Sequence, residues 1–121
     1  MRPLQLSEIE PFLKRFDNFK DGEVRCINII TPMQIIISLA AQDAARAYDW
    51  INVDLEFNGV EDARVVDNEQ LRFIDLSEGV SLIFEDHKIA FALNKCYNIS
   101  ASKNSICYVI SASLKYKEGV F

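Results

Sequence analysis

The feature that most constrains the fold is a change in the spacing of apolar residues near Gly22. Before Gly22 apolar side chains recur every three or four residues, and after it they alternate with polar ones. The first spacing is typical of an amphipathic helix and the second of a strand with one buried face. The pattern predicts an N-terminal helix at about residues 7–20 and a β-rich part at about residues 23–117.

The predicted helix has an aromatic stripe on one side and charged residues on the other. Ser7 and Glu10 fit a capping box, and Pro11 is tolerated only near a helix start. The stripe consists of Phe12, Leu13, Phe16 and Phe19. We expect it to face the protein core, because a helix of this kind buries its apolar side.

Alternating apolar and polar residues recur along the rest of the chain, as half-buried antiparallel strands require. The expected strands lie near residues 24–30, 51–57, 71–73, 80–84, 89–93 and 106–116. In the first of them Val24, Cys26, Asn28 and Ile30 would share one side. Short turns such as Asn58-Gly59 connect them. The fold class is therefore α+β, an N-terminal helix followed by a mainly antiparallel meander sheet of six or seven strands, curved or closed into a barrel.

Residues 32–47 allow two interpretations. A Thr-Pro start and an alanine-rich run favour a helix over residues 32–47. The β-branched run at residues 35–37 favours a strand instead. We favour a hairpin that pairs residues 33–42 with residues 48–57 across a loop at residues 43–46.

Length and charge restrict the class of protein. With 121 residues the chain fits a single domain, residues 1–121. Its net charge of −5 argues against nucleic acid as a partner, because phosphate contacts need clustered Lys and Arg. No apolar run approaches the roughly 20 residues of a membrane-spanning helix, and the start of the chain lacks a signal-peptide core. We therefore expect a cytoplasmic protein with no membrane partner.

The sequence contains no motif that assigns catalytic, cofactor-binding or metal-binding residues. His87 is the only histidine, and we interpret it as part of a polar turn. Cys26, Cys96 and Cys107 have neither zinc-ligand spacing nor an even count, so we expect reduced thiols. Calcium at residues 75–79 is disfavoured, since that run has too few ligands. No cofactor and no metal are predicted.

Acidic residues are concentrated in one part of the chain. Residues 54–86 contain ten acids and two arginines, so this segment carries −8 and the remainder +3. Such a segment predicts either a negative patch that attracts a basic partner or ordinary solvated residues. Trp50 would lie on the polar face of its strand as an interface anchor. The candidate partner-binding residues are Trp50, Asp54, Glu56, Glu61, Asp62, Asp75, Glu78, Glu85 and Asp86.

Residues 19–24, Phe-Lys-Asp-Gly-Glu-Val, and residues 50–60, Trp-Ile-Asn-Val-Asp-Leu-Glu-Phe-Asn-Gly-Val, carry a family resemblance. With the short strands that follow, they resemble a loose group of small uncharacterised bacterial β-rich proteins. Some of these are similar to the immunity proteins that accompany polymorphic toxins. The resemblance covers residues 19–95 and implies a cytoplasmic inhibitor that neutralises a toxin by binding it. It assigns no site residue.

Three hypotheses follow. The first is a non-catalytic protein-binding module, an immunity-type toxin inhibitor with an acidic face for a basic protein. The alternative is a small ligand-binding or enzymatic β-barrel-like domain that uses His87, Glu85, Asp86 or a cysteine. The third, compatible with the first, is a homodimer formed by edge-to-edge pairing of residues 26–41 or of residues 106–117.

Overall fold

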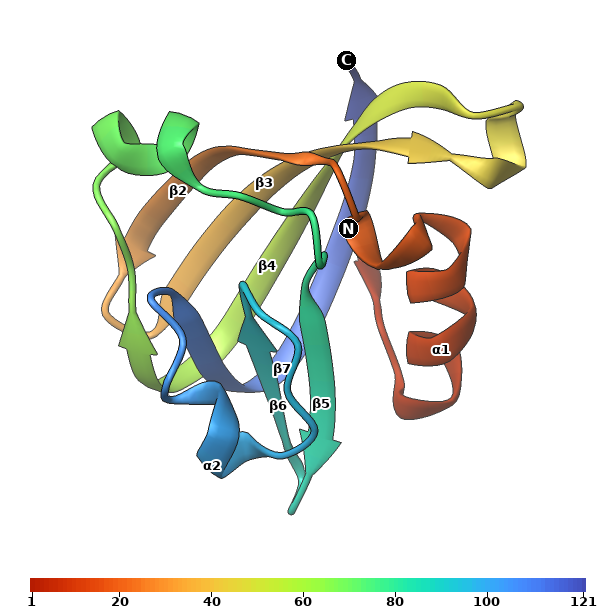
Figure 1. Ribbon diagram of the computed structural model, residues 1–121. Coiled ribbons are helices and arrows are strands. Elements are labelled where there is room, and N and C mark those ends of the chain that lie inside the picture. Colours follow the sequence, from red (N-terminus) through yellow and green to blue (C-terminus); the bar gives the residue numbers. More distant parts are fainter.

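The computed structural model describes all residues, 1–121, and shows an N-terminal helix followed by an open, seven-stranded antiparallel sheet (Figure 1). The strands are β1 (Arg2–Pro3), β2 (Glu23–Thr31), β3 (Gln34–Asp43), β4 (Asp49–Arg64), β5 (Ser81–Glu85), β6 (Lys88–Ala92) and β7 (Tyr108–Val120). The helices are α1 (Leu6–Arg15) and α2 (Ile99–Ser102), with 3-10 turns η1 (Asp17–Phe19), η2 (Ala44–Arg46) and η3 (Asn68–Phe73). The α+β prediction is confirmed. None of the helices is long and apolar enough to cross a membrane.

The strand order is β2-β3-β4-β7-β6-β5, so the sheet consists of two meanders joined where β4 pairs with β7. On its other edge β7 pairs with β6 and with the short β1. Because β7 has partners on both edges, the expected homodimer through residues 106–117 has no free edge there. β2 and β5 end the six-strand path, and the short β1 is paired with β7 on one side.

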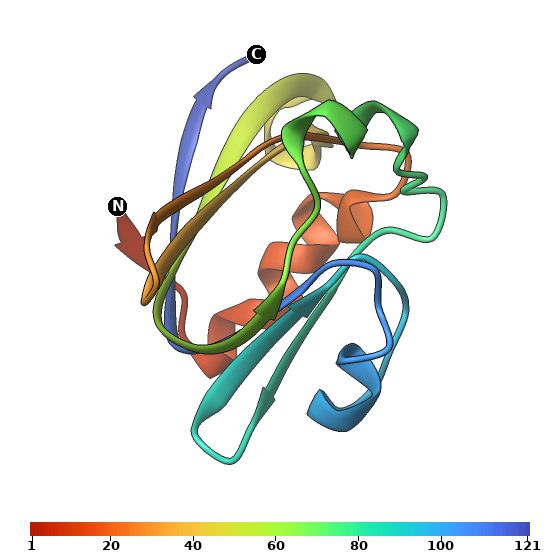
Figure 2. The ribbon, with the colours of Figure 1, turned by 90° about the vertical axis from the view of Figure 1, so that its left-hand side faces the viewer.

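The long strands β4 and β7 bend together at Gly59. Gly59 has a φ of +68°, a left-handed conformation that glycine adopts without cost. A Cβ atom at this position would lie 2.9 Å from the Cβ of Ala112 on β7. The inward-facing residues of β4 change from odd to even numbers between Phe57 and Val60, both buried. The bend divides the sheet into a part with β2 and β3 and a part with β5 and β6 (Figure 2).

Helix α1 lies on the inner side of the bent sheet and contributes its aromatic stripe to the core. Phe12, Phe16 and Phe19 are 6%, 1% and 0% exposed, which confirms the predicted core-facing stripe. The Phe12 ring also lies 4.9 Å from that of Tyr116 on β7. In η1, Asp17 to Phe19 have positive φ values, and this left-handed turn directs the chain toward β2. Aromatic packing therefore holds the helix to the sheet.

The helix begins and ends earlier than its pattern indicates. Its first residue is Leu6, and the capping carboxylate is Glu8, which accepts a hydrogen bond from the Gln5 amide at 3.2 Å. Ser7 and Glu10 are therefore not the capping pair, and Pro11 lies in the second turn. The cause is β1, whose pairing with β7 fixes the chain up to the start of α1.

The hairpin interpretation of residues 32–47 is confirmed. β3 and β4 pair from Gln34 opposite Asn58 to Asp43 opposite Asp49. The loop contains η2, where the Asp43 carboxylate accepts a hydrogen bond from the Ala45 amide at 2.9 Å. The alanine-rich run therefore supplies the end of β3 and a tight turn.

Four further local predictions are wrong. Asn58 and Gly59 form no turn between strands but lie within the single long strand β4. Residues 71–73 belong to η3, where Leu71 is buried and Phe73 is exposed. A bulge between Val24 and Cys26 shifts the alternation of β2, so that Ile27 faces the core. β7 begins only at Tyr108, which leaves residue 106 outside the strand. Bulges and 3-10 turns change the period locally, and a short apolar pair does not reveal this.

Candidate functional site on the outer sheet face

One surface of the sheet has no helix over it. It is formed by β2, β3, the first half of β4 and the second half of β7, on the side away from α1 (Figure 2). We call this surface the outer face. Its principal side chains are Gln34, Ser38, Trp50, Asn52, Asp54, Glu56, Asn58, Lys115 and Lys117.

Strand β4 positions the acidic residues of the outer face. Ile51, Val53, Leu55 and Phe57 are at most 4% exposed and point to the core. Because successive side chains of a strand alternate between its faces, the even-numbered residues between them point outward. This confirms the alternation predicted for β4.

The two carboxylates of the outer face are held by neighbouring polar side chains. The Ser38 hydroxyl donates to Asp54 Oδ1 at 2.6 Å, and Gln34 Nε2 donates to Glu56 Oε1 at 2.8 Å. Asn58 Nδ2 adds a longer bond of 3.3 Å to Glu56 Oε2. Side chains fixed in this way lose little further conformational freedom when a partner binds.

Lysines lie beside these carboxylates. In the pairing of β4 with β7, Asp54 is opposite Lys117 and Glu56 is opposite Lys115. Directly opposed side chains on one face of an antiparallel pair have Cβ atoms roughly 5 Å apart. The outer face therefore presents a mixed charge pattern, two acids next to two bases, rather than a uniformly negative patch.

An aromatic corner lies at one end of the outer face. The rings of Trp50 and Phe121 are 5.7 Å apart, and the Arg25 guanidinium lies 4.7 Å from the Phe121 ring. Trp50 is 38% exposed and Phe121 is 54% exposed. Large amphipathic side chains of this kind are favoured as interface anchors. We call Trp50, Phe121 and Arg25 the aromatic corner.

The remaining predicted acids lie elsewhere. Glu61 and Asp62 follow the bend at Gly59. Lys88 contacts Glu61 at 2.9 Å, and Lys103 contacts Asp62 at 3.6 Å. These two acids are thus near bases at the other end of β4.

Three further acids are on connecting segments, and a fourth is at the end of β5. Asp75 and Glu78 lie between η3 and β5, while Glu85 and Asp86 are at the β5–β6 hairpin end. Asp75 accepts a hydrogen bond from the Ser77 amide at 2.8 Å, a local turn contact. Of the nine candidate residues, the outer face brings together Trp50, Asp54 and Glu56.

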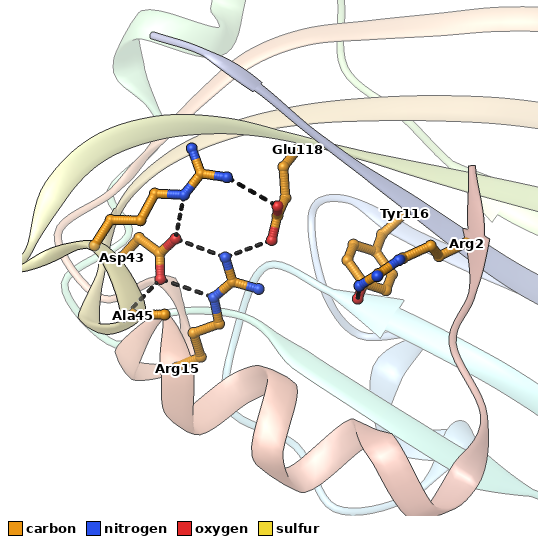
Figure 3. A network of polar contacts seen from close by, with 7 residues as sticks. Arg2, Arg15, Asp43, Ala45, Tyr116 and Glu118 are labelled. Atoms are coloured by element: carbon orange, nitrogen blue, oxygen red, sulfur yellow. Dashed lines mark hydrogen bonds and ion pairs between the residues drawn. The ribbon is translucent and has the colours of Figure 1, made fainter.

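A second polar cluster joins α1 to the end of the sheet (Figure 3). Arg15 donates from Nε and Nη2 to the two Asp43 oxygens at 2.7 and 2.6 Å and also contacts Glu118. Arg46 lies 3.4 Å from Asp43 and 3.0 Å from Glu118. Two arginines thus balance two carboxylates, so the cluster has no net charge to attract a ligand.

Electrostatics explain how this cluster is held together. The Asp43 side chain is fully buried, and burial alone would disfavour its charge. Hydrogen bonds from Arg15 outweigh this effect and hold the pKa of Asp43 below its ordinary value, with a further contribution from the Ala45 amide. We therefore interpret the cluster as a structural link between α1, β3 and β7.

Of the residues proposed for an enzymatic site, Glu85, Asp86 and His87 share the β5–β6 hairpin end, while the cysteines lie on other segments. His87 is exposed at the tip of the β5–β6 turn, with a φ of 62°, and makes no side-chain hydrogen bond or ion pair. Cys107 is buried, which raises its pKa to about 11. Cys26 and Cys96 are half-buried on β2 and after β6. No group of three or more His, Cys, Asp and Glu side chains is arranged to hold a metal ion.

Comparison of the chain with protein-family models, curated proteins and solved structures found no match. The geometry of the outer face is therefore the basis for any functional assignment.

Among the candidate residues from the sequence, only Trp50, Asp54 and Glu56 belong to the outer face, and its lysines and the other two members of the aromatic corner were missed. Lys115 and Lys117 lie on the polar side of the alternating last strand, but their proximity to β4 depends on the β4–β7 pairing. Arg25 and Phe121 are separated by most of the chain, and no local pattern indicates that they meet. The only sequence signal for these four residues is the alternation of apolar and polar residues in β7. It indicates that the two lysines face outward, and it says nothing about Arg25 or Phe121.

Proposed function

We propose that the protein is a non-catalytic protein-binding module that docks its partner on the outer face. The observation that supports this proposal is an uncovered sheet surface on which two carboxylates are fixed beside an aromatic corner. Trp50 supplies apolar contact area, and Asp54 and Glu56 supply charge at defined positions. A fixed polar surface with an aromatic anchor is suited to protein recognition.

The arrangement favours a partner with basic side chains. Asp54 uses Oδ1 to accept from Ser38, while its Oδ2 accepts no hydrogen bond within the chain. An Arg or Lys of the partner can bind this oxygen as a charge-assisted donor. Lys115 and Lys117 favour acidic positions on the same partner, because complementary charge fixes the orientation of docking.

An immunity-type inhibitor of a basic toxin is the specific form of this proposal. The overall charge of −5 supports it, since it favours encounter with a cationic protein. The resemblance to immunity-type proteins supports a bacterial, cytoplasmic inhibitor.

The test is affinity capture from the native host with immobilised wild-type protein and outer-face variants. Trp50→Ala and Asp54→Lys should each lower recovery of a basic partner at least tenfold. Tyr97→Ala and Glu78→Lys are matched controls, because both residues are exposed and lie away from the outer face, and they should retain the partner. A partner that is lost with the controls but kept by the outer-face variants would contradict the proposal, as would capture of no specific partner.

A further inference from the structure

The outer face contains two acid–base pairs that are opposed but not joined. Asp54 on β4 is opposite Lys117 on β7. Two residues further along the strands, Glu56 is opposite Lys115. Opposite charges at such positions attract each other and commonly form a cross-strand pair. Neither lysine, however, forms an ion pair with any carboxylate of the chain. The charges of the two strands are therefore kept apart.

Strand β3 accounts for this separation. In the sheet β4 lies between β3 on one side and β7 on the other. The Ser38 hydroxyl of β3 donates to Asp54 Oδ1 at 2.6 Å. The Gln34 side-chain amide of β3 donates to Glu56 Oε1 at 2.8 Å. Both acids are thus drawn toward β3 and away from the lysines of β7.

The separation leaves the charges available to a partner. Asp54 Oδ2 accepts no hydrogen bond within the chain, and the side chains of Lys115 and Lys117 are exposed. An exposed ion pair adds little to stability, so the chain loses little by keeping these charges apart. A partner would have to break such an ion pair before it could contact either charge, and here it avoids that cost. The separation therefore favours binding more than folding.

We propose that Ser38 and Gln34 are positioning residues of the docking surface, which hold an acidic row on β4 apart from a basic row on β7. Neighbouring strands are roughly 5 Å apart, and residues two apart on one strand are roughly 7 Å apart. The partner that fits this pattern is a protein surface with basic side chains next to acidic ones at the same spacings, the basic ones over β4. This inference rests on the proposed function and specifies the charge pattern of the partner.

The two acids differ in what they offer the partner. Glu56 accepts hydrogen bonds at both oxygens, from Gln34 and from Asn58, whereas Asp54 accepts at Oδ1 alone. A basic side chain of the partner therefore binds Asp54 Oδ2 directly, while Glu56 contributes mainly through its charge. Asp54→Asn should weaken binding at least about tenfold, and Glu56→Gln no more than about threefold.

Replacing Ser38 tests the positioning role. In Ser38→Ala the Asp54 side chain can turn toward Lys117, and the ion pair that forms competes with the partner. Calorimetric titration of the captured partner should show binding about fivefold weaker, the change expected when one side chain must be immobilised. Ser38→Thr keeps the hydroxyl on a residue that strands favour and should bind as wild type does. Ser100→Ala is the matched control, because Ser100 is exposed on α2, away from the outer face.

Double variants separate a positioning role from a structural one. Lys117→Ala removes the competing base, so adding Ser38→Ala to it should cost no more than about twofold. Adding Ser38→Ala to Asp54→Asn should likewise have no further effect. A structural role of Ser38 would give the same loss in every background. Wild-type affinity of Ser38→Ala, or a loss that is unchanged in both backgrounds, would overturn the proposal.

A measurement on the isolated protein keeps this inference separate from the proposed function. Three-bond NMR couplings of the Asp54 side chain report its χ1 rotamer. Wild-type protein should show one rotamer, and Ser38→Ala should show a different or averaged one. An Asp54 rotamer that does not respond to the loss of the Ser38 hydroxyl would overturn the positioning role even if a partner is captured. Capture of no specific partner, together with the expected rotamer change, would overturn the proposed function and leave the positioning of Asp54 supported.

Discussion

Arg15 at the end of α1 holds Asp43 at the end of β3 through two hydrogen bonds of 2.7 and 2.6 Å. The Asp43 side chain is fully buried, whereas that of Arg15 is 24% exposed. Helix and sheet are thus joined by a carboxylate that has given up its hydration and depends on its partner.

Replacing Arg15 should destabilise the protein strongly. Arg15→Ala leaves the buried Asp43 carboxylate without its two-point partner, which we expect to cost about 3 kcal/mol of the free energy of unfolding. Urea unfolding monitored by circular dichroism measures this loss. Arg25→Ala is the control, because the Arg25–Glu23 pair is exposed and should contribute no more than about 1 kcal/mol. Equal effects of the two substitutions would contradict the interpretation of Arg15 as a structural link.

The same link makes stability depend on pH. The pKa of Asp43 is lower in the folded protein than its unfolded value of about 3.9, so its contribution is complete above that value. It is lost as the pH falls below about 4, through the lower folded-state pKa. The stability difference between wild type and Asp43→Asn should be constant from pH 5 to 8 and should shrink below pH 4. A difference that stays constant down to pH 2 would show that the charge of Asp43 contributes nothing.

The bend at Gly59 should tolerate no side chain. Gly59→Ala places a Cβ 2.9 Å from that of Ala112 at a φ of +68°, and we expect a loss of about 2 kcal/mol. Gly119→Ala is the control on β7, since the added Cβ would meet nothing closer than 3.9 Å. Thermal and urea unfolding should show that Gly59→Ala is clearly less stable than Gly119→Ala. Similar stabilities would mean that the bend does not need a left-handed residue.

The β5–β6 turn should accept substitution of His87. Asp86 and His87 have φ values of 53° and 62°, the conformation that Asn-Gly favours in two-residue hairpins. Asp86→Asn combined with His87→Gly should therefore raise stability by about 1 kcal/mol and leave partner capture unchanged. A loss of capture with unchanged folding would return His87 to the list of functional residues.

The sequence was informative where a regular period runs uninterrupted. The alternation from Ile51 to Phe57 and the stripe of α1 both predicted the buried side correctly. The spacing of apolar residues predicted the wrong buried side at the β2 bulge and at η3. At these places one extra residue or one tight turn reverses which side is buried. Local chemistry cannot reveal such reversals, because the tertiary contacts that favour them come from distant segments.

Only some residues of the candidate site could be predicted from the sequence. Trp50, Asp54 and Glu56 share one strand, so alternation alone places them on one face. The other acids are close in sequence but separate in space, because the bend at Gly59 and the joined meanders direct them elsewhere. The pairing of β4 with β7 brings Lys115 and Lys117 beside the acids. The sequence of neither strand indicates that the two strands pair.

The most direct test of outer-face docking uses Trp50, the only tryptophan of the chain. Its fluorescence should be recorded while a tryptophan-free form of the captured partner is added, with complex formation followed in parallel by calorimetry. Docking on the outer face predicts a saturable shift of the emission to shorter wavelength, because the partner removes water from the indole, with the same midpoint as the calorimetric curve. Complete binding by calorimetry with unchanged Trp50 emission would contradict the assignment of the outer face as the docking surface.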